Sequence, residues 1–147
     1  MTPKKILFCT DFSMNSEPAR RCAVAYAEAF GAELLLVHVI DSSGFPSYLD
    51  WVGDELDQIL RRTKDWAQAK LDDMAKECAG SVKSMKTLCK VGVAAHEIVY
   101  LAEEESADLI VVGTHGHTGV KHLVMGSIAR SVLRMAHRPV LIVEAPV

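Results

Sequence analysis

LIVVGTHGHTGVKHLVMGSIARSV, residues 109–132, joins a short apolar run to a glycine-rich loop and then to a helical pattern. The run Leu109–Val112 is too short for a helix and is apolar on both faces, so it predicts a buried strand of a parallel sheet. Directly after Gly126, apolar residues recur at helical spacing from Ser127 to Ala136. A strand that leads through such a loop into a helix indicates an α/β protein.

The rest of the chain repeats this alternation of strand and helix. Short apolar runs predict four further strands, at Ile6–Cys9, Leu34–Val39, Val82–Val91 and Val140–Val143. Between them, helical spacing predicts helices over 19–30, over 56–78 with an apolar stripe along its whole length, and over 96–106. Ser16 is expected to cap the first helix and Gly31 to end it. The alternation predicts one α/β domain over residues 1–147, with a parallel sheet and right-handed crossovers.

Composition excludes several classes of protein. The 147 residues are 50% hydrophobic and 24% charged, which excludes an intrinsically disordered chain. A formal net charge of −3 gives no reason to expect nucleic acid or a membrane surface as a partner. No apolar run approaches the roughly 18 residues of a membrane span, and the first apolar stretch ends at Asp11, too early for a secretion signal. We therefore expect a cytoplasmic protein.

The loop over residues 113–126 has the chemistry of a phosphate site. Its glycines, at positions 113, 116, 119 and 126, allow a positive φ or a close approach of the backbone to a ligand. The helix that begins at Ser127 offers unpaired amides, a partial positive charge and a hydroxyl. Neither the GxGxxG nor the Walker A pattern is present. On these residues alone, a phosphate site and a loop whose glycines only form turns are equally open.

Gly113-x2-Gly116-x9-Gly126-Ser127 resembles the ATP-binding motif of the universal stress protein family. The resemblance extends along the chain, through KKILFCTDFS at 4–13, LLLVHVID at 34–41, VGVAAHEIVYLAEEESADLIVVGTHGHTG at 91–119 and RPVLIV at 138–143. It implies a doubly wound, five-stranded parallel sheet in the order 3-2-1-4-5, with helices on both faces. It also implies a homodimer that binds ATP together with Mg²⁺.

The resemblance further implies which residues bind the nucleotide: Thr10, Asp11, Val39, Val112, Gly113, His115, Gly116, Gly126, Ser127 and Ile128. The expected strand order agrees with this set, because winding reverses between the first and fourth strands, and ligands of doubly wound sheets bind at that switch point. Val39 and Val112 are implied to act through their backbones. Asp11 is implied to lie near the adenosine, although an aspartate at this place can also simply cap a turn.

The resemblance implies a regulatory protein of the stress response that binds ATP, rather than an efficient enzyme. No general base is paired with a nucleophile, and no arginine is placed by a motif to stabilise a transferred phosphoryl group, so we assign no catalytic residue. A slow ATP hydrolase and a nucleotide-free structural dimer remain the alternatives. His115 and His117 have no third ligand at a defined spacing, so we predict no metal site built from side chains.

The last predicted strand indicates how two copies would associate. In the implied order it lies at the edge of the sheet, and VLIV at 140–143 carries no charge. An apolar edge is normally protected by charges, bulges or a cover, and here only Pro139 and Glu144 flank it. We therefore expect a homodimer in which this strand pairs with its copy across a two-fold axis. The role of the long loop over 40–53 stays open.

Overall fold

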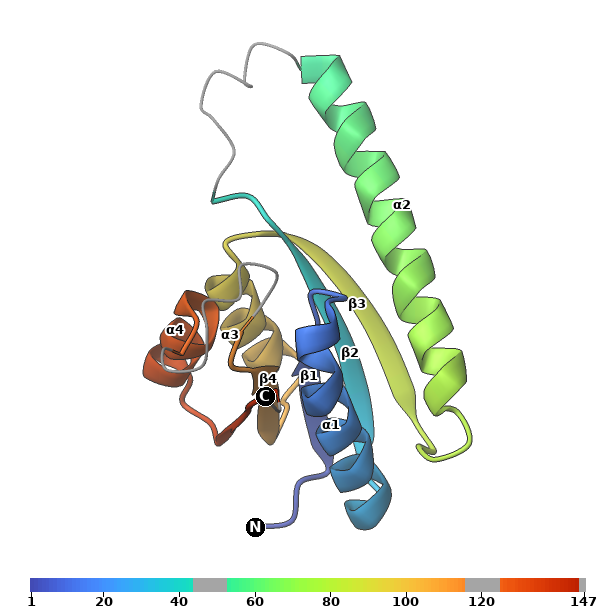
Figure 1. The fold of residues 1–147 in the computed structure, drawn as a ribbon, viewed down its shortest axis with the longest axis vertical. Helices are drawn as coiled ribbons and strands as arrows, with labels where there is room; N and C mark the ends of the chain where they lie inside the picture. The colour runs from blue at the N-terminus through green and yellow to red at the C-terminus, as the bar shows by residue number, and fades with distance from the viewer. Residues whose placement is uncertain (44–52, 116–124, 146–147) are drawn as a thin grey trace.

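A five-stranded sheet forms the centre of the molecule (Figure 1). The computed structural model describes residues 1–43, 53–115 and 125–145. Every pair of neighbouring strands is parallel, and the order across the sheet is β3-β2-β1-β4-β5. The predicted doubly wound sheet with the order 3-2-1-4-5 is therefore confirmed. The chain winds outward from β1 to β3 and then, in the opposite direction, from β1 to β5.

The elements alternate as the sequence predicts. The strands are β1 (Lys5–Cys9), β2 (Glu33–Asp41), β3 (Met85–Gly92), β4 (Leu109–Gly113) and β5 (Val140–Val143). A 3-10 turn, η1 (Met14–Ser16), precedes the helices α1 (Glu17–Phe30), α2 (Gly53–Cys78), α3 (Ala94–Glu104) and α4 (Ser127–Met135). Within the described residues, no helix is both long and apolar enough to cross a membrane.

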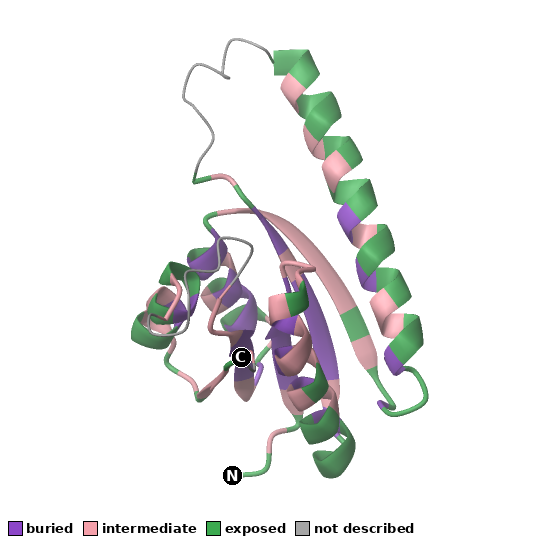
Figure 2. Cartoon of the chain, in the orientation of Figure 1, coloured by how far each residue is buried: buried purple, intermediate pink, exposed green. Residues whose placement is uncertain are grey.

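Two helical layers cover the two faces of the sheet. Side chains alternate along a strand, so Leu7 and Ile110 pack beneath α3 and α4, whereas Ile6, Phe8 and Val111 pack on the side of α1 and α2. The central strands are therefore buried on both faces, as Figure 2 shows in purple. Full burial of each such side chain contributes about 1.5–3 kcal/mol, which explains why these strands read as continuous apolar runs.

One strand begins later than predicted. The sequence places its start at Val82, whereas β3 begins at Met85. Val82 is buried, but its amide donates to the carbonyl of Cys78, so it belongs to the turn that follows α2. An apolar residue in a turn packed beneath the helices looks in the sequence like the first residue of a strand.

The start of α1 also differs from the expectation. Ser16 makes no side-chain capping bond, because the 3-10 turn holds it in a helical conformation before α1 begins. Its hydroxyl instead donates to the carbonyl of Ser13 at 2.8 Å and lies 3.0 Å from the hydroxyl of Thr10. The predicted end is confirmed, since Gly31 adopts a left-handed φ of 63° and its amide reaches the last carbonyls of the helix.

The long helix α2 extends beyond the sheet (Figure 1). Its 26 residues span about 39 Å, whereas the eight residues of β3 span about 26 Å. The predicted apolar stripe is therefore buried only in its second half, at Ala67, Leu71 and Cys78. No residue from 53 to 66 is buried, and Figure 2 shows this half of the helix in green and pink.

An ion-pair network ties α1 to α2. The guanidinium of Arg20 donates to both carboxylate oxygens of Glu17, at 2.7 and 2.6 Å, and to Glu77 at 3.0 Å. These hydrogen bonds from Arg20 hold the pKa of Glu17 below its ordinary range. A carboxylate whose pKa is lowered by folding stabilises the fold above its unfolded pKa of about 4.3, and it loses that contribution as the pH falls through the folded pKa.

Glu17→Gln is accordingly expected to lower the free energy of unfolding by about 1 kcal/mol at pH 7. The difference from the wild type should shrink as the pH falls below about 4.3, because Glu17 becomes protonated there in the unfolded chain and then in the folded one. Urea denaturation at several pH values measures this difference in the free energy of unfolding. Glu28→Gln is the matched control, since Glu28 is exposed on the same helix and forms no ion pair with another described residue. An equal effect of both substitutions would contradict the assignment.

Candidate functional site

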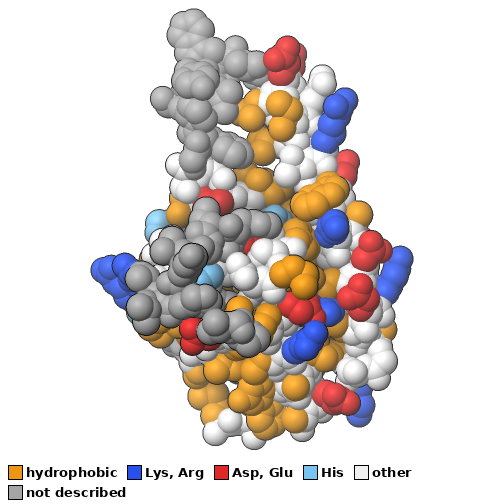
Figure 3. Space-filling model, viewed as in Figure 1, with side chains coloured by type: hydrophobic (Ala, Val, Ile, Leu, Met, Phe, Trp, Pro, Cys, Tyr) orange, Lys and Arg blue, Asp and Glu red, His pale blue; other side chains and the backbone are white. Residues whose placement is uncertain are grey.

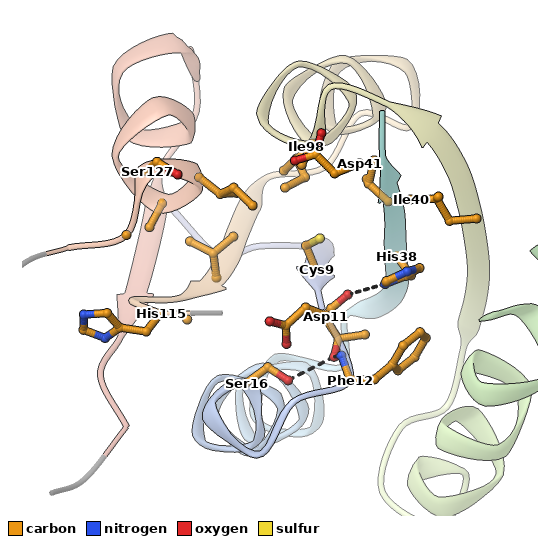
Figure 4. Close-up of a pocket in the computed structure, with 18 of the residues that line it drawn as sticks. Cys9, Asp11, Phe12, Ser16, His38, Ile40, Asp41, Ile98, His115 and Ser127 are labelled. Carbon is orange, nitrogen blue, oxygen red and sulfur yellow. Dashed lines mark hydrogen bonds between the residues drawn. The ribbon is translucent and has the colours of Figure 1, made fainter. Parts of the chain in front are cut away.

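A cavity of about 640 Å³ lies where the carboxyl ends of β1, β2 and β4 meet (Figure 4). This is the point at which the winding of the sheet reverses, so the cavity occupies the position expected of a doubly wound fold. Its lining comes from these strand ends, from η1, and from all helices but α1: Cys9, Thr10, Asp11, Phe12, Ser16, His38, Val39, Ile40, Asp41, Thr63, Trp66, Ala94, Ile98, Val112, Gly113, Thr114, His115, Gly126, Ser127, Ile128 and Ala129.

The structure brings together nine of the ten residues proposed from the sequence. Lining residues include Thr10 and Asp11 after β1, Val39 in β2, and the β4–α4 set: Val112, Gly113, His115, Gly126, Ser127 and Ile128. Gly116 lies outside the described residues, as do His117 and most of the long 40–53 loop. Among the described residues, no group of three His, Cys, Asp or Glu side chains is arranged to hold a metal ion.

The loop after β1 fixes the carboxylate of Asp11 at the cavity wall. Asp11 Oδ1 accepts hydrogen bonds from the amide of Ser13 at 2.9 Å and from its hydroxyl at 2.6 Å. Thr10, which is buried, accepts at its hydroxyl from the amide of Phe12 at 2.9 Å. Phe12, which lies between Asp11 and Ser13 in this loop, adopts a left-handed φ of 64°. Asp11 therefore caps its turn and lines the cavity at once, so the two interpretations of this residue do not exclude each other.

Aromatic rings form one side of the cavity. Phe12 stacks on His38 with ring centroids 4.4 Å apart, and Trp66 meets Phe12 edge to face at 5.5 Å. His38 Nδ1 lies 2.8 Å from the carbonyl oxygen of Thr10, so this nitrogen carries the proton and donates it (Figure 4). None of these three rings was proposed for the site from the sequence. The position of His38 near the end of β2 is the signal that could have found it.

Main-chain groups of Val39 face the cavity because β2 continues past the end of β1. The amide of Thr10 donates to the carbonyl of Val37, so the peptide groups of Val37 point toward β1. The peptide groups of residues two apart on a strand point the same way, so those of Val39 also point toward the side of β1. Because β1 ends at Cys9, which lies opposite Val37, no residue of β1 lies opposite Val39. The backbone amide of Val39 donates a hydrogen bond to the sulfur of Cys9. Burial, helped by the charge of Asp11, raises the pKa of the Cys9 thiol to about 12, so this thiol stays protonated at neutral pH.

The start of α4 is held against the end of β4. The amide of Gly126 donates to the carbonyl of Thr114 at 2.7 Å, and the amide of Thr114 donates to Val143 in β5 at 3.0 Å. The φ of Gly126 is −59°, so this glycine is not needed for a positive φ. It is needed for space, because a Cβ there would lie 2.7 Å from the carbonyl oxygen of Thr114. Gly126, which precedes α4, has no side chain that could cap the helix, so among the described residues the amides of the first turn are left for a ligand or water.

The side chains around the cavity carry few charges. Its described lining holds two carboxylates, Asp11 and Asp41, and no lysine or arginine. His115 lies at the α4 end, where its Nδ1 is 2.9 Å from the hydroxyl of Thr114. The rest of the lining is mostly apolar, with polar atoms at the strand ends and at the start of α4, a distribution typical of small-molecule sites.

Comparison with known proteins agrees with this geometry. A profile described as the Universal stress protein family matches residues 2–144. Universal stress protein MJ0531 of Methanocaldococcus jannaschii is 38% identical over 146 residues, which cover 97% of this chain and 83% of that protein. The solved structure of the hypothetical protein MJ0577 from the same organism has a TM-score of 0.89 at 31% identity, covering 100% of this chain and 99% of the other.

A crystal structure of a universal stress protein in complex with cAMP has a TM-score of 0.65 at 26% identity and covers 98% of each chain. The likeness thus extends over almost the whole sequence and includes every strand of the sheet. This chain belongs to the universal stress protein family.

Proposed function

We propose that this protein binds ATP with Mg²⁺ in the cavity at the switch point of the sheet, and that it acts in the cytoplasm as a nucleotide-dependent regulator of the stress response. The observation that carries the proposal is the arrangement of the cavity. The peptide groups of Val39 lie along one wall, and the uncapped start of α4 at Gly126 and Ser127 forms another. The relative in complex with cAMP supports a nucleotide as the class of ligand.

The β2 side of the cavity suits a nucleobase. The apolar side chains of Ala94, Ile98 and Val112 offer surfaces for a flat ring, and the carbonyl of Val39 offers an acceptor to an amino group on its edge. A volume of about 640 Å³ falls within the range usual for small-molecule sites, about 300–1,000 Å³. We assign the adenine of ATP to this side of the cavity.

The α4 side suits phosphates bound together with a cation. The amides at the start of a helix attract anions, and Ser127 adds a hydroxyl. Because the described lining has no lysine or arginine, and Asp11 carries a negative charge, a triphosphate there needs a counter-ion. Mg²⁺ prefers oxygen ligands, and the Ser127 hydroxyl would supply one beside the oxygens of the phosphates, while the Asp11 carboxylate on the cavity wall would act as a further oxygen donor if the phosphates, rather than the adenosine that the resemblance implies, lie next to it. The donor set therefore fits the proposed Mg²⁺.

Slow ATP hydrolysis is the second candidate, and the place of His115 favours it. The imidazole lies at the α4 end, where the phosphates are assigned, and it is hydrogen-bonded to the Thr114 hydroxyl. In that position it can orient a water molecule toward the terminal phosphate. No cationic side chain of the described lining is available to stabilise the transferred phosphoryl group, so we expect turnover to be slow.

Isothermal titration of the full chain with ATP and Mg²⁺ is expected to give a Kd of about 0.3–7 µM, which corresponds to roughly −9 to −7 kcal/mol. Replacing Mg²⁺ with EDTA should weaken binding about tenfold or more, because the phosphates and Asp11 then repel each other. The protein must first be shown by mass spectrometry to carry no nucleotide. Absence of both heat and thermal shift in such a sample would refute the proposal, and phosphate release in the same samples measures hydrolysis.

We also propose that β5 pairs two copies into a homodimer. The backbone supports this arrangement. The carbonyl of Pro139 accepts a hydrogen bond from the amide of Ile110 in β4, and that of Val143 accepts one from Thr114, which directly follows β4. The peptide groups of Val140 and Ile142 therefore point away from the sheet. All four side chains of β5 are only half-buried. A second β5 running antiparallel across a two-fold axis would pair these outward groups.

A further inference from the structure

The main-chain groups of Val39 that face the cavity lack the partners that a continued β1 would give them. Just beyond β1, the amide of Thr10 still donates to the carbonyl of Val37. By the parallel pattern, the next two bonds would join the amide of Val39 to the carbonyl of Thr10 and the carbonyl of Val39 to the amide of Phe12. Neither bond forms. Instead, the carbonyl of Thr10 accepts a hydrogen bond from His38 Nδ1 at 2.8 Å, and the amide of Phe12 donates to the hydroxyl of Thr10 at 2.9 Å.

Val39 therefore presents a donor and an acceptor side by side near the end of β2. The amide and the carbonyl of one residue in an extended strand point the same way. Adenine carries the complementary pair on two of its edges, because its amino group donates and the ring nitrogen beside that group, N1 or N7, accepts. Among the described residues, no backbone amide donates to the carbonyl of Val39, so this acceptor is open to an amino group.

The thiol of Cys9 takes the donor of this pair. Cys9 is the last residue of β1 and lines the cavity, and it packs in the same cluster as Ala94, Ile98 and Val112, the side chains assigned to the base. Figure 4 shows its sulfur (yellow) pointing from the end of β1 toward the side of Ile98. The amide of Val39 donates its hydrogen bond to this sulfur, which lies where a ring nitrogen of the base would otherwise accept.

We propose that Cys9 is a positioning residue that sets which bases the cavity accepts, by holding the amide of Val39 and leaving only the carbonyl of Val39 to read the base. The inference rests on the proposed function, which assigns the base to this side of the cavity. The described lining holds no lysine or arginine, and in Figure 3 such side chains (blue) lie mostly over the helices. The cavity then selects a base by its exocyclic amino group, and the ring nitrogens beside that group contribute little.

Analogues of ATP test this selection in the wild-type chain by isothermal titration with Mg²⁺. Inosine triphosphate has an oxygen in place of the amino group, so it should bind at least about tenfold more weakly than ATP, because two acceptors then face each other. The 1-deaza and 7-deaza analogues of ATP each replace one ring nitrogen with C–H, and both should bind within about twofold of ATP. A loss of about tenfold with either deaza analogue would overturn the inference, because the amide of Val39 would then read that nitrogen.

Cys9→Ala frees the amide of Val39, so the ring nitrogen that faces it begins to count. One of the two deaza analogues should then bind this variant about tenfold more weakly than ATP. The ratio of the two affinities cancels changes in packing or stability, since both ligands meet the same variant. Cys89→Ala is the matched control, because Cys89 is also half-buried but packs on the other face of the sheet and does not line the cavity. It should keep the wild-type preference.

Two results with these variants would also overturn the inference. One is a folded Cys9→Ala chain, as judged by circular dichroism, that binds ATP and both deaza analogues equally. The other is a Cys89→Ala chain that gains the same new preference. If the wild type bound neither ATP nor its analogues, the proposed function would fail and the inference with it, whereas ATP binding with the wrong pattern of analogues refutes the role of Cys9 alone.

Discussion

Gly126→Ala is expected to weaken ATP binding by at least ~100-fold, or about 2.7 kcal/mol. The new Cβ would lie 2.7 Å from the carbonyl oxygen of Thr114, which is backbone and cannot turn aside as a side chain would. Relief requires the start of α4 to move away from the end of β4, and the 2.7 Å hydrogen bond between Gly126 and Thr114 is then lost. The amides assigned to the phosphates move with it. Isothermal titration measures the affinity, and a thermal melt reports the fold.

Gly80→Ala is the matched control for this substitution, because a Cβ at Gly80 meets nothing within 4 Å. It should leave both affinity and melting temperature nearly unchanged. If Gly126→Ala bound ATP as tightly as Gly80→Ala, the start of α4 would not hold the phosphates. If neither variant nor the wild type bound ATP, the proposed function itself would fail.

Ile142→Pro is expected to convert the proposed homodimer into a monomer. The amide of Ile142 points away from β4, so a proline removes a donor needed for pairing between copies and leaves the β4–β5 hydrogen bonds in place. Size-exclusion chromatography with light scattering at tens of micromolar gives the mass. The cavity at the switch point should be less affected, because β5 contributes no residue to its lining.

Ile142→Ala separates the lost donor from the lost side chain. It removes most of the half-buried side chain that packs against the α3–α4 layer, and it keeps the amide. We expect it to be less stable than the wild type and still dimeric. A monomeric wild type would refute the dimer, and a dimeric Ile142→Pro would place the interface elsewhere.

Prediction from sequence succeeded where burial alone sets the pattern of apolar residues along the chain. The strands β1, β2, β4 and β5 are continuous apolar runs because both faces of the central sheet are covered, and strand ends of such a sheet converge at the switch point. Asp11 and Gly113 were expected there because they end their strands, and Val39 was expected there from the family resemblance; all three line the cavity.

Sequence reasoning failed where the three-dimensional path of the chain decides which residues contact each other. Trp66 reaches the cavity only because α2 is longer than the strands beside it, which no local pattern encodes. Val82 was assigned to a strand because apolar residues buried in a turn have the same composition. The sequence left open whether Gly126 serves a positive φ or a close approach of the backbone; its φ is not positive, and what it needs is space beside Thr114, a contact across eleven intervening positions.

The cavity is assembled from strand ends and helix starts that lie far apart along the chain, from Cys9 to Ala129. In the unfolded chain these residues are not held together, so a ligand that fills the cavity binds only the folded protein. Mass action then stabilises the fold by about 2.7 kcal/mol when the free ligand is at 100 times its Kd. A fall in ligand concentration raises the population of unfolded chains open to proteolysis. The abundance of this protein would thereby follow the supply of its ligand, with no separate sensor.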